Sequence, residues 1–265
     1  MKRLERLGSV VLFTITITLV LHILAMSSNR WKTNICRNCD PRIPLASWST
    51  SLLQRCYDSS VATIFSINDS NFNEHINEFV TQLCIPNKFI VSENPYQAMD
   101  CLAKANQLPD IYCSIKYSNL DVCQCDYSSG TKGTVAMTIL AACALGILVL
   151  LTHLVSFAKT DYMLKWLIPF SFSLLIFSIV CIFITLIFVG ATLKQDVYEL
   201  RDYLHDALYN VTINATWVDQ LNNLTEADYD VKIGWCFGIE IVALYFAVIS
   251  LVLYGLIFVA KKRPE

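Results

Sequence analysis

The sequence predicts an all-α membrane protein, a four-helix bundle that carries an extracellular β-sheet subdomain stapled by disulfides. Two observations predict this fold class. The 265 residues are 55% hydrophobic and 16% charged, with a mean hydropathy of +0.48, which is too apolar for a soluble domain. Eight of the 11 cysteines lie between the first two apolar segments, which is typical of a disulfide-rich outer domain.

Four segments are nearly free of charge over about 20 residues, the length that spans a bilayer. They cover residues 7–26, 135–158, 166–190 and 233–260. The remaining parts are the N-terminus at 1–6, a long loop at 27–134, a connection at 159–165, a second loop at 191–232 and a tail at 261–265.

Basic flanks predict the orientation, because short cytoplasmic segments carry an excess of Lys and Arg. The N-terminus, the 159–165 connection and the tail are basic, whereas residues 194–232 hold three basic and eight acidic residues. We therefore expect a multi-pass protein of the plasma membrane with both termini in the cytoplasm and both loops outside. The basic residues are Lys2, Arg3, Arg6, Lys159, Lys165, Lys261, Lys262 and Arg263.

The first segment has an alternative interpretation as a cleaved signal peptide. Residues 1–7 are a basic n-region, and Ala25-Met26-Ser27 is an acceptable small-residue cleavage site. The apolar run of about 20 residues is longer than the 7–15 residues of a signal core. Its length favours a retained span, and either outcome leaves the later topology unchanged.

Four Asn-x-Ser/Thr motifs agree with this topology, because glycan acceptors must face the secretory lumen. All four lie in the loops assigned outside, and they predict a glycoprotein. They begin at Asn68, Asn210, Asn214 and Asn223.

The outer cysteines predict a framework of up to four disulfides whose connectivity is open. Two alternatives stay open at lower weight. Cys36 and Cys39 form a C-x-x-C motif that could act in thiol exchange, and with Cys123 and Cys125 they could bind zinc. The outer set is Cys36, Cys39, Cys56, Cys84, Cys101, Cys113, Cys123 and Cys125, and Cys143, Cys181 and Cys236 lie in the spans as small buried residues.

The long loop predicts a small sheet with a helical insert. We expect strands over 31–36, 51–58, 61–67 and 114–125, which are rich in β-branched and apolar residues. Apolar residues recur at helical spacing over 76–83 and 98–105. A similar stripe over 197–208 predicts that the third span continues beyond the bilayer as a helix.

Small and ionisable residues inside the spans predict how the helices meet. Gly234-x-x-x-Gly238 and Ala142-x-x-x-Gly146 allow close helix contact, which we expect within the bundle. Glu240 is a carboxylate inside a span, where a charge demands a partner or a function. His22 lies at the same depth in the first span, so we expect a His22–Glu240 hydrogen bond or ion pair; a wet vestibule or a neutral Glu240 is the alternative.

The sequence contains no motif for a catalytic nucleophile, a nucleotide or a catalytic metal. We expect no enzymatic activity, no catalytic residues, no cofactor and no nucleic-acid partner. The function then resides in contacts with other proteins and with the lipid bilayer.

Three short motifs resemble the claudin superfamily, which includes peripheral myelin proteins, calcium-channel gamma subunits and stargazin-like receptor regulators. "MSSNRW" resembles the Ser and Trp after the family's first helix, at Trp31. "SLLQRC" is similar to its G-L-W-x-x-C core at Leu52 and Cys56, and "KIGWCFG" is similar to its Gly-Trp opening of the fourth helix, at Gly234 and Trp235. The likeness implies an antiparallel sheet standing on the bundle, with Cys56 in its disulfide, Trp31 as a membrane anchor and Cys36 and Cys39 as extra staples.

The chain departs from the family pattern in several places. Ser51 and Leu53 replace the Gly and Trp of the core motif, the second cysteine expected about ten residues later is missing, and the first loop is about twice the usual length. The likeness implies a non-enzymatic organiser or auxiliary subunit that binds integral membrane proteins in the same membrane, with adhesive contacts to its own family in the opposite one. A junction barrier protein, a thiol oxidoreductase using Cys36 and Cys39, and a homo-oligomeric state stay open.

Overall fold

The computed structural model describes residues 2–36, 47–58, 82–90, 125–157, 161–193 and 229–262. The chain divides into two compact units. One contains residues 1–28, 133–190 and 235–265, and the other contains residues 29–132 and 191–234. The first unit is built from helices and the second is built around a small antiparallel sheet.

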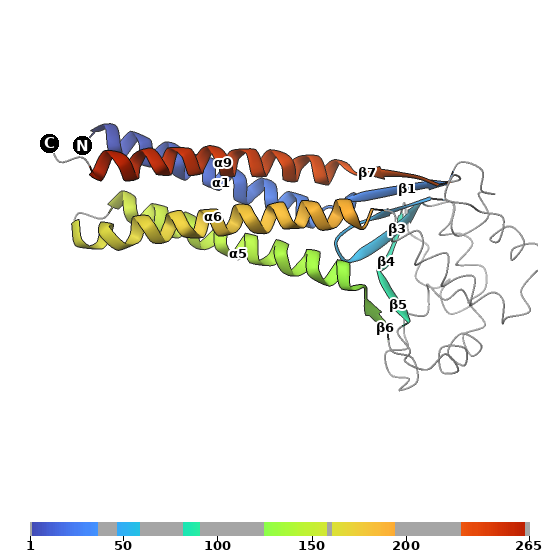
Figure 1. Cartoon of the computed structure of the whole chain (residues 1–265). Helices are drawn as coiled ribbons and strands as arrows, with labels where there is room; N and C mark the ends of the chain where they lie inside the picture. Colours follow the sequence, from blue (N-terminus) through green and yellow to red (C-terminus); the bar gives the residue numbers. More distant parts are fainter. Residues whose placement is uncertain are drawn as a thin grey trace, which may run out of the picture. The chain divides into compact units, whose positions relative to one another are not determined.

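Four long helices form the first unit (Figure 1). Each contains a stretch that is long and apolar enough to cross a membrane, as in a multi-pass membrane protein. The helices are α1 (Lys2–Ser27), α5 (Ser129–Phe157), α6 (Asp161–Ala191) and α9 (Trp235–Lys262).

All four helices start at other residues than the predicted spans: α1 and α6 start five residues earlier, and the starts of α5 and α9 differ for local reasons. α5 begins at Ser129 instead of 135 because the Ser128 hydroxyl accepts a hydrogen bond from the Thr131 amide at 3.3 Å, as an N-cap does. α9 begins at Trp235 instead of 233 because Ile233 ends a strand. The hydropathy of residues 233–260 does not show where the strand gives way to the helix.

The bundle is antiparallel, with α1 beside α9 and α5 beside α6 (Figure 1). The starts of α1 and α6 and the ends of α5 and α9 lie at one end of the bundle (Figure 1). These helix ends contain most of the residues of the basic segments at 1–6, 159–165 and 261–265.

Each helix buries a line of residues that alternates steps of three and four, the heptad spacing of left-handed helix packing. The lines contain many hydroxyl and small side chains as well as aliphatic ones. They are Val11, Ile15, Thr18, His22 and Ala25 in α1; Thr134, Thr138, Ala141, Leu145, Leu148 and Thr152 in α5; Ile168, Ser171, Leu175, Ser178, Ile182, Thr185 and Val189 in α6; and Cys236, Glu240, Ala243, Ala247, Ser250, Tyr254 and Ile257 in α9.

The second unit contains a five-stranded antiparallel sheet in the order β4-β3-β2-β1-β7. β7 comes from the second loop and pairs with β1 of the first, so both loops build one sheet. A second sheet pairs β5 with β6. The strands are β1 (Lys32–Cys36), β2 (Ser47–Thr50), β3 (Gln54–Asp58), β4 (Gln82–Pro86), β5 (Lys88–Ile90), β6 (Cys125–Tyr127) and β7 (Tyr229–Ile233).

The predicted strand over 51–58 is wrong at its start. The Ser51 amide donates to the Gln54 carbonyl at 2.8 Å and the Ser51 hydroxyl accepts from the Gln54 amide at 2.8 Å, which makes a turn. The helical prediction over 76–83 is wrong at Leu83, which pairs with Tyr57 in the sheet. The features expected over 61–67, 98–105 and 197–208 lie outside the described residues, as does most of 114–125.

Candidate functional site: a buried His–Glu pair between three helices

The most polar part of the bundle is the pair formed by His22 and Glu240. His22 lies on the buried line of α1, and Glu240 lies on the buried line of α9. Both side chains are 0% exposed. The heptad spacing of the two lines turns both residues away from lipid and toward each other.

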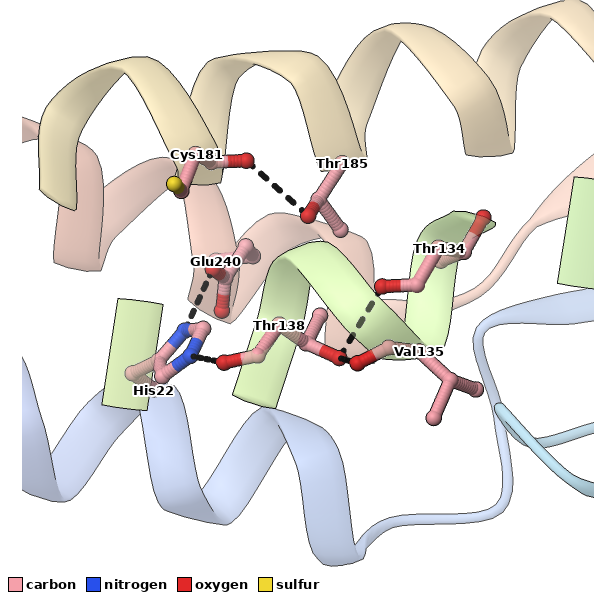
Figure 2. A network of polar contacts seen from close by, with 7 residues as sticks. All are labelled: His22, Thr134, Val135, Thr138, Cys181, Thr185 and Glu240. Atoms are coloured by element: carbon pink, nitrogen blue, oxygen red, sulfur yellow. Dashed lines mark hydrogen bonds and ion pairs between the residues drawn. The ribbon is translucent and has the colours of Figure 1, made fainter. Parts of the chain in front are cut away.

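His22 uses both ring nitrogens to join three helices. Its Nδ1 lies 2.6 Å from Oε1 of Glu240, and its Nε2 lies 3.0 Å from the backbone carbonyl oxygen of Thr138 in α5. Figure 2 shows the imidazole of α1 between the Glu240 side chain and the backbone of α5. The structure therefore brings together the two residues predicted to meet and adds a third helix.

The acceptor at Nε2 restricts where the protons lie. A carbonyl oxygen only accepts hydrogen bonds, so Nε2 of His22 carries a hydrogen and donates it to Thr138. The short contact between Nδ1 and Oε1 also requires a shared proton, because two lone pairs would repel at that distance. The pair holds two protons and has no net charge whether the shared proton is nearer the nitrogen or the oxygen.

A pair with no net charge is the form that burial favours. A lone charge deep in a bundle of apolar helices is costly, and pairing removes most of that cost. Oε2 of Glu240 is buried and accepts no hydrogen bond from the described residues. One carboxyl oxygen therefore carries the whole contact with α1.

The threonine hydroxyls of Thr138 and Thr185, near the pair, are satisfied within their own helices. Thr138 directs its hydroxyl at the carbonyls of Thr134 and Val135, at 3.0 and 2.8 Å, and the Thr185 hydroxyl donates to the Cys181 carbonyl at 3.0 Å (Figure 2). Further along α1 and α9, the oxygens of Ser250 and Thr14 lie 2.8 Å apart. α1 and α9 are thus joined by polar contacts at two levels.

The geometry suits a structural role better than a reactive one. Both nitrogens of His22 are occupied and neither partner is exposed to solvent. Among the residues that the structure describes, no group of three or more His, Cys, Asp or Glu side chains could hold a metal ion. The pair can hold α1, α5 and α9 in one register and can keep a proton inside the bundle.

The signature residues at the start of α9 have a role in the sheet. Gly234 lies between β7 and α9, and its amide donates to the Trp31 carbonyl at 2.8 Å. A Cβ at Gly234 would lie 1.8 Å from the carbonyl oxygen of Arg30, so no other residue fits without a backbone shift. Trp31 is 2% exposed, whereas Trp235 is 52% exposed and Leu52 is half-buried.

The two small-residue motifs do not make the intramolecular contacts that were predicted. Gly234 lies outside the helix, and nothing lies within 4 Å of a Cβ built at Gly238 or at Gly146. The prediction of close packing at these glycines within the bundle is wrong. Gly238 is exposed on α9, and Gly234 is required by the sheet instead.

Cys56 and Cys84 form a disulfide between β3 and β4, where they are directly opposite each other. Cys36 lies in β1 and Cys125 in β6. Cys39, Cys101, Cys113 and Cys123 lie outside the described residues, as do Asn68, Asn210, Asn214 and Asn223. Cys143, Cys181 and Cys236 lie in the helices outside any disulfide of the described residues, and Cys143 is exposed rather than buried as predicted.

Two buried basic residues of the sheet were not predicted. Lys32 in β1 is 6% exposed and donates to the carbonyl and hydroxyl oxygens of Thr192 at 2.7 and 2.9 Å. Arg55 in β3 is 1% exposed and donates to the Lys88 carbonyl at 3.3 Å. The register aligns Lys32 with Thr50 and Thr50 with Arg55, which places both basic residues on one face of the sheet. Basic residues are normally assigned to the solvent face, so their residue type did not indicate burial.

No protein-family model matches this chain, and no curated protein shows a significant match to it.

Proposed function

We propose that the protein is a non-enzymatic four-span glycoprotein of the plasma membrane, with both termini in the cytoplasm, that organises other integral membrane proteins. In this proposal the protein resembles members of the claudin superfamily. It acts as an auxiliary subunit or membrane organiser and makes adhesive contacts through its outer segments. One observation carries the proposal. The His22–Glu240 pair is fully buried with both imidazole nitrogens engaged, so these two ionisable groups of the spans serve the bundle rather than a substrate.

The sheet supports a role in protein contacts. β1 follows α1 after four residues and β7 precedes α9 by one residue, and the two strands are paired along their length. The Cys56–Cys84 disulfide joins β3 to β4, and the hydrogen bond from Gly234 to Trp31 joins the residues next to β7 and β1. A sheet tied in this way is a rigid platform for a partner, because binding then orders few additional groups.

The resemblance to claudins implied an antiparallel sheet with Cys56 in a disulfide. The β4-β3-β2-β1-β7 sheet and the Cys56–Cys84 bond agree with both expectations, which supports the proposed likeness. Three glycans at Asn210, Asn214 and Asn223 would hinder tight packing of loops between cells, so lateral association is preferred to a junction barrier.

The test is purification of the tagged full-length protein from cells in mild detergent, followed by identification of the membrane proteins that accompany it. Recovery of a defined channel or receptor supports the proposal. The test variant is Gly234→Ala, which disturbs the sheet. The matched control is Gly146→Ala, whose added Cβ meets nothing within 4 Å. We expect Gly146→Ala to retain the partner and Gly234→Ala to lose it.

Two further measurements decide between this proposal and its alternatives. Clustering of otherwise non-adherent cells that express the protein, without a partner in the same membrane, would favour the junction role. A double Cys36→Ser/Cys39→Ser variant that reaches the surface but loses thiol exchange would favour the oxidoreductase.

A further inference from the structure

Tyr245 places a hydroxyl group on the lipid-facing side of α9, near the middle of the span. Its side chain is 63% exposed, and the apolar part of α9 covers Trp235–Val259. At 1.5 Å per residue, Tyr245 lies about 15 Å along the helix from Trp235. That distance is longer than a tyrosine side chain, so the hydroxyl does not reach the membrane–water interface.

Other exposed hydroxyls in the spans are satisfied by their own helix. Thr16 donates to the Leu12 carbonyl at 2.8 Å, and Ser173 donates to the Pro169 carbonyl at 3.0 Å. A tyrosine ring is too long to turn its hydroxyl back onto the preceding turn in this way. Among the described residues Tyr245 has only a ring contact, with Phe246. An unsatisfied hydroxyl in hydrocarbon is unfavourable, so whatever covers this face must bring a hydrogen-bonding group to the same depth.

The exposed residues around Tyr245 recur at the sequence spacing that is typical of a contact between two packed helices. They follow steps of three and four, opposite the line that α9 buries in its own bundle. Gly238 has nothing within 4 Å of a Cβ, so a neighbouring backbone can approach there. The residues of this outer line are Gly238, Ile241, Tyr245, Val248 and Val252.

We infer that this line of α9 is a self-association surface, on which the α9 helix of a second copy packs with the two Tyr245 hydroxyls hydrogen-bonded to each other. A two-fold axis along the membrane normal brings identical residues together at identical depth. A tyrosine hydroxyl can donate or accept, so in the pair one Tyr245 hydroxyl donates the hydrogen bond and the other accepts it, and the two can exchange these roles. The second copy thereby supplies the polar group at the depth where Tyr245 needs it.

The inference rests on the four membrane spans of the proposed function and is independent of its partners. The first test therefore checks insertion, by washing membranes that contain the full-length protein at alkaline pH. Release from the membrane would overturn this inference and the proposed function together. Retention followed by absence of a dimer would overturn this inference alone.

Cross-linking tests the geometry. In a Cys143→Ser background, which removes the exposed thiol, Val252→Cys is oxidised in native membranes and compared with Val180→Cys on α6. The two positions are similarly exposed, at 59% and 47%. We expect a disulfide-linked dimer from Val252→Cys and a monomer from Val180→Cys. Equal dimer from both, no dimer from Val252→Cys, or a bond from Val252→Cys to a different protein would each overturn the second copy as the occupant.

Removal of the hydroxyl tests the chemistry. Tyr245→Phe should lower the dimerisation constant about 3-fold to about 20-fold, the range expected for one hydrogen bond between membrane helices. Thr16→Val is the matched control, because its exposed hydroxyl is already bonded to Leu12 and its loss should leave dimerisation unchanged. Energy transfer between two differently labelled full-length copies in bilayers measures the dimerisation constants of both variants. An unchanged constant for Tyr245→Phe would contradict the pairing of the hydroxyls.

Discussion

His22 and Glu240 are 218 residues apart in the sequence, yet Nδ1 of one lies 2.6 Å from Oε1 of the other in the buried interior of the bundle. The second nitrogen of His22 is bonded to the Thr138 carbonyl, so removal of either side chain affects the packing of three helices. Substitutions in the buried pair should therefore lower the stability of the whole bundle.

Replacing one member of the pair should be worse than replacing both. We expect His22→Leu to destabilise the bundle by about 3–5 kcal/mol, because Glu240 then remains buried without its partner. The double variant His22→Leu/Glu240→Leu should recover part of that loss, because it leaves neither an unpaired acid nor an unpaired imidazole. Thermal unfolding and the yield of monodisperse protein in detergent measure both variants.

Glu240→Gln is the control for the single and double variants, because the amide of the glutamine can still donate a hydrogen bond to Nδ1 of His22. It should retain most of the stability. Unchanged folding yield in His22→Leu and in Glu240→Gln alike would contradict a structural role for the pair.

Gly234 should tolerate no side chain. A Cβ there would meet the Arg30 carbonyl oxygen at 1.8 Å, so Gly234→Ala requires a backbone shift between β7 and α9. We expect a loss of about 3 kcal/mol or more and poor delivery to the cell surface. Surface labelling of intact cells measures delivery, with Gly146→Ala as the control that should behave like the wild type. Normal delivery of Gly234→Ala would mean that the strand–helix junction adapts easily.

Loss of the disulfide should loosen the sheet. Cys56 and Cys84 close a loop with a sequence separation of 28, and removal of such a crosslink costs about 3–4 kcal/mol through the entropy of the unfolded chain. Cys56→Ser/Cys84→Ser should therefore become sensitive to limited proteolysis in its outer segments. The free thiol Cys143 provides the control, because Cys143→Ser removes no crosslink. Equal protease resistance in the two variants would show that this bond is dispensable.

The pair formed by Asp126 and Lys132 should give a small acid-dependent effect. The hydrogen bond from Lys132 lowers the pKa of Asp126 below its ordinary value, and both side chains are about half exposed. A carboxyl whose folded pKa is lowered stabilises the fold above its unfolded pKa of about 3.9, and that contribution is lost as the pH falls through the folded pKa. Asp126→Asn should therefore unfold slightly earlier than the wild type at neutral pH and equally at strongly acidic pH. Thermal unfolding across pH measures this, and a difference that grows toward acid would reverse the predicted sign.

Sequence patterns predicted contacts correctly where a residue needs a particular kind of partner in its surroundings. Glu240 in an apolar segment demands a partner, and counting turns from the helix ends identified His22 at the same depth. Thr138 was missed because a backbone carbonyl is the acceptor, and a backbone group leaves no trace in the residue type. The buried faces of the helices were missed for a related reason. In lipid the outer face is as apolar as the inner one, so hydropathy shows no periodicity.

The strands show the same division. The apolar and β-branched residues of 31–36 predicted a strand, but its partner β7 lies about two hundred residues further along the chain, in a loop with an acidic composition. Gly234 suggested helix packing by its motif and is instead required by the Arg30 carbonyl. Spacing along one element could not reveal a contact with another.

The sequence by itself determined the four apolar segments, the basic ends and the concentration of cysteines in one loop, because segment length, charge and spacing are properties of the chain in one dimension. Only the tertiary structure decided which face of each helix is buried, that His22 bonds to α5 as well as α9, and that both loops share one sheet. Those outcomes depend on which distant backbone and side-chain atoms come within hydrogen-bonding distance, and packing in three dimensions sets that.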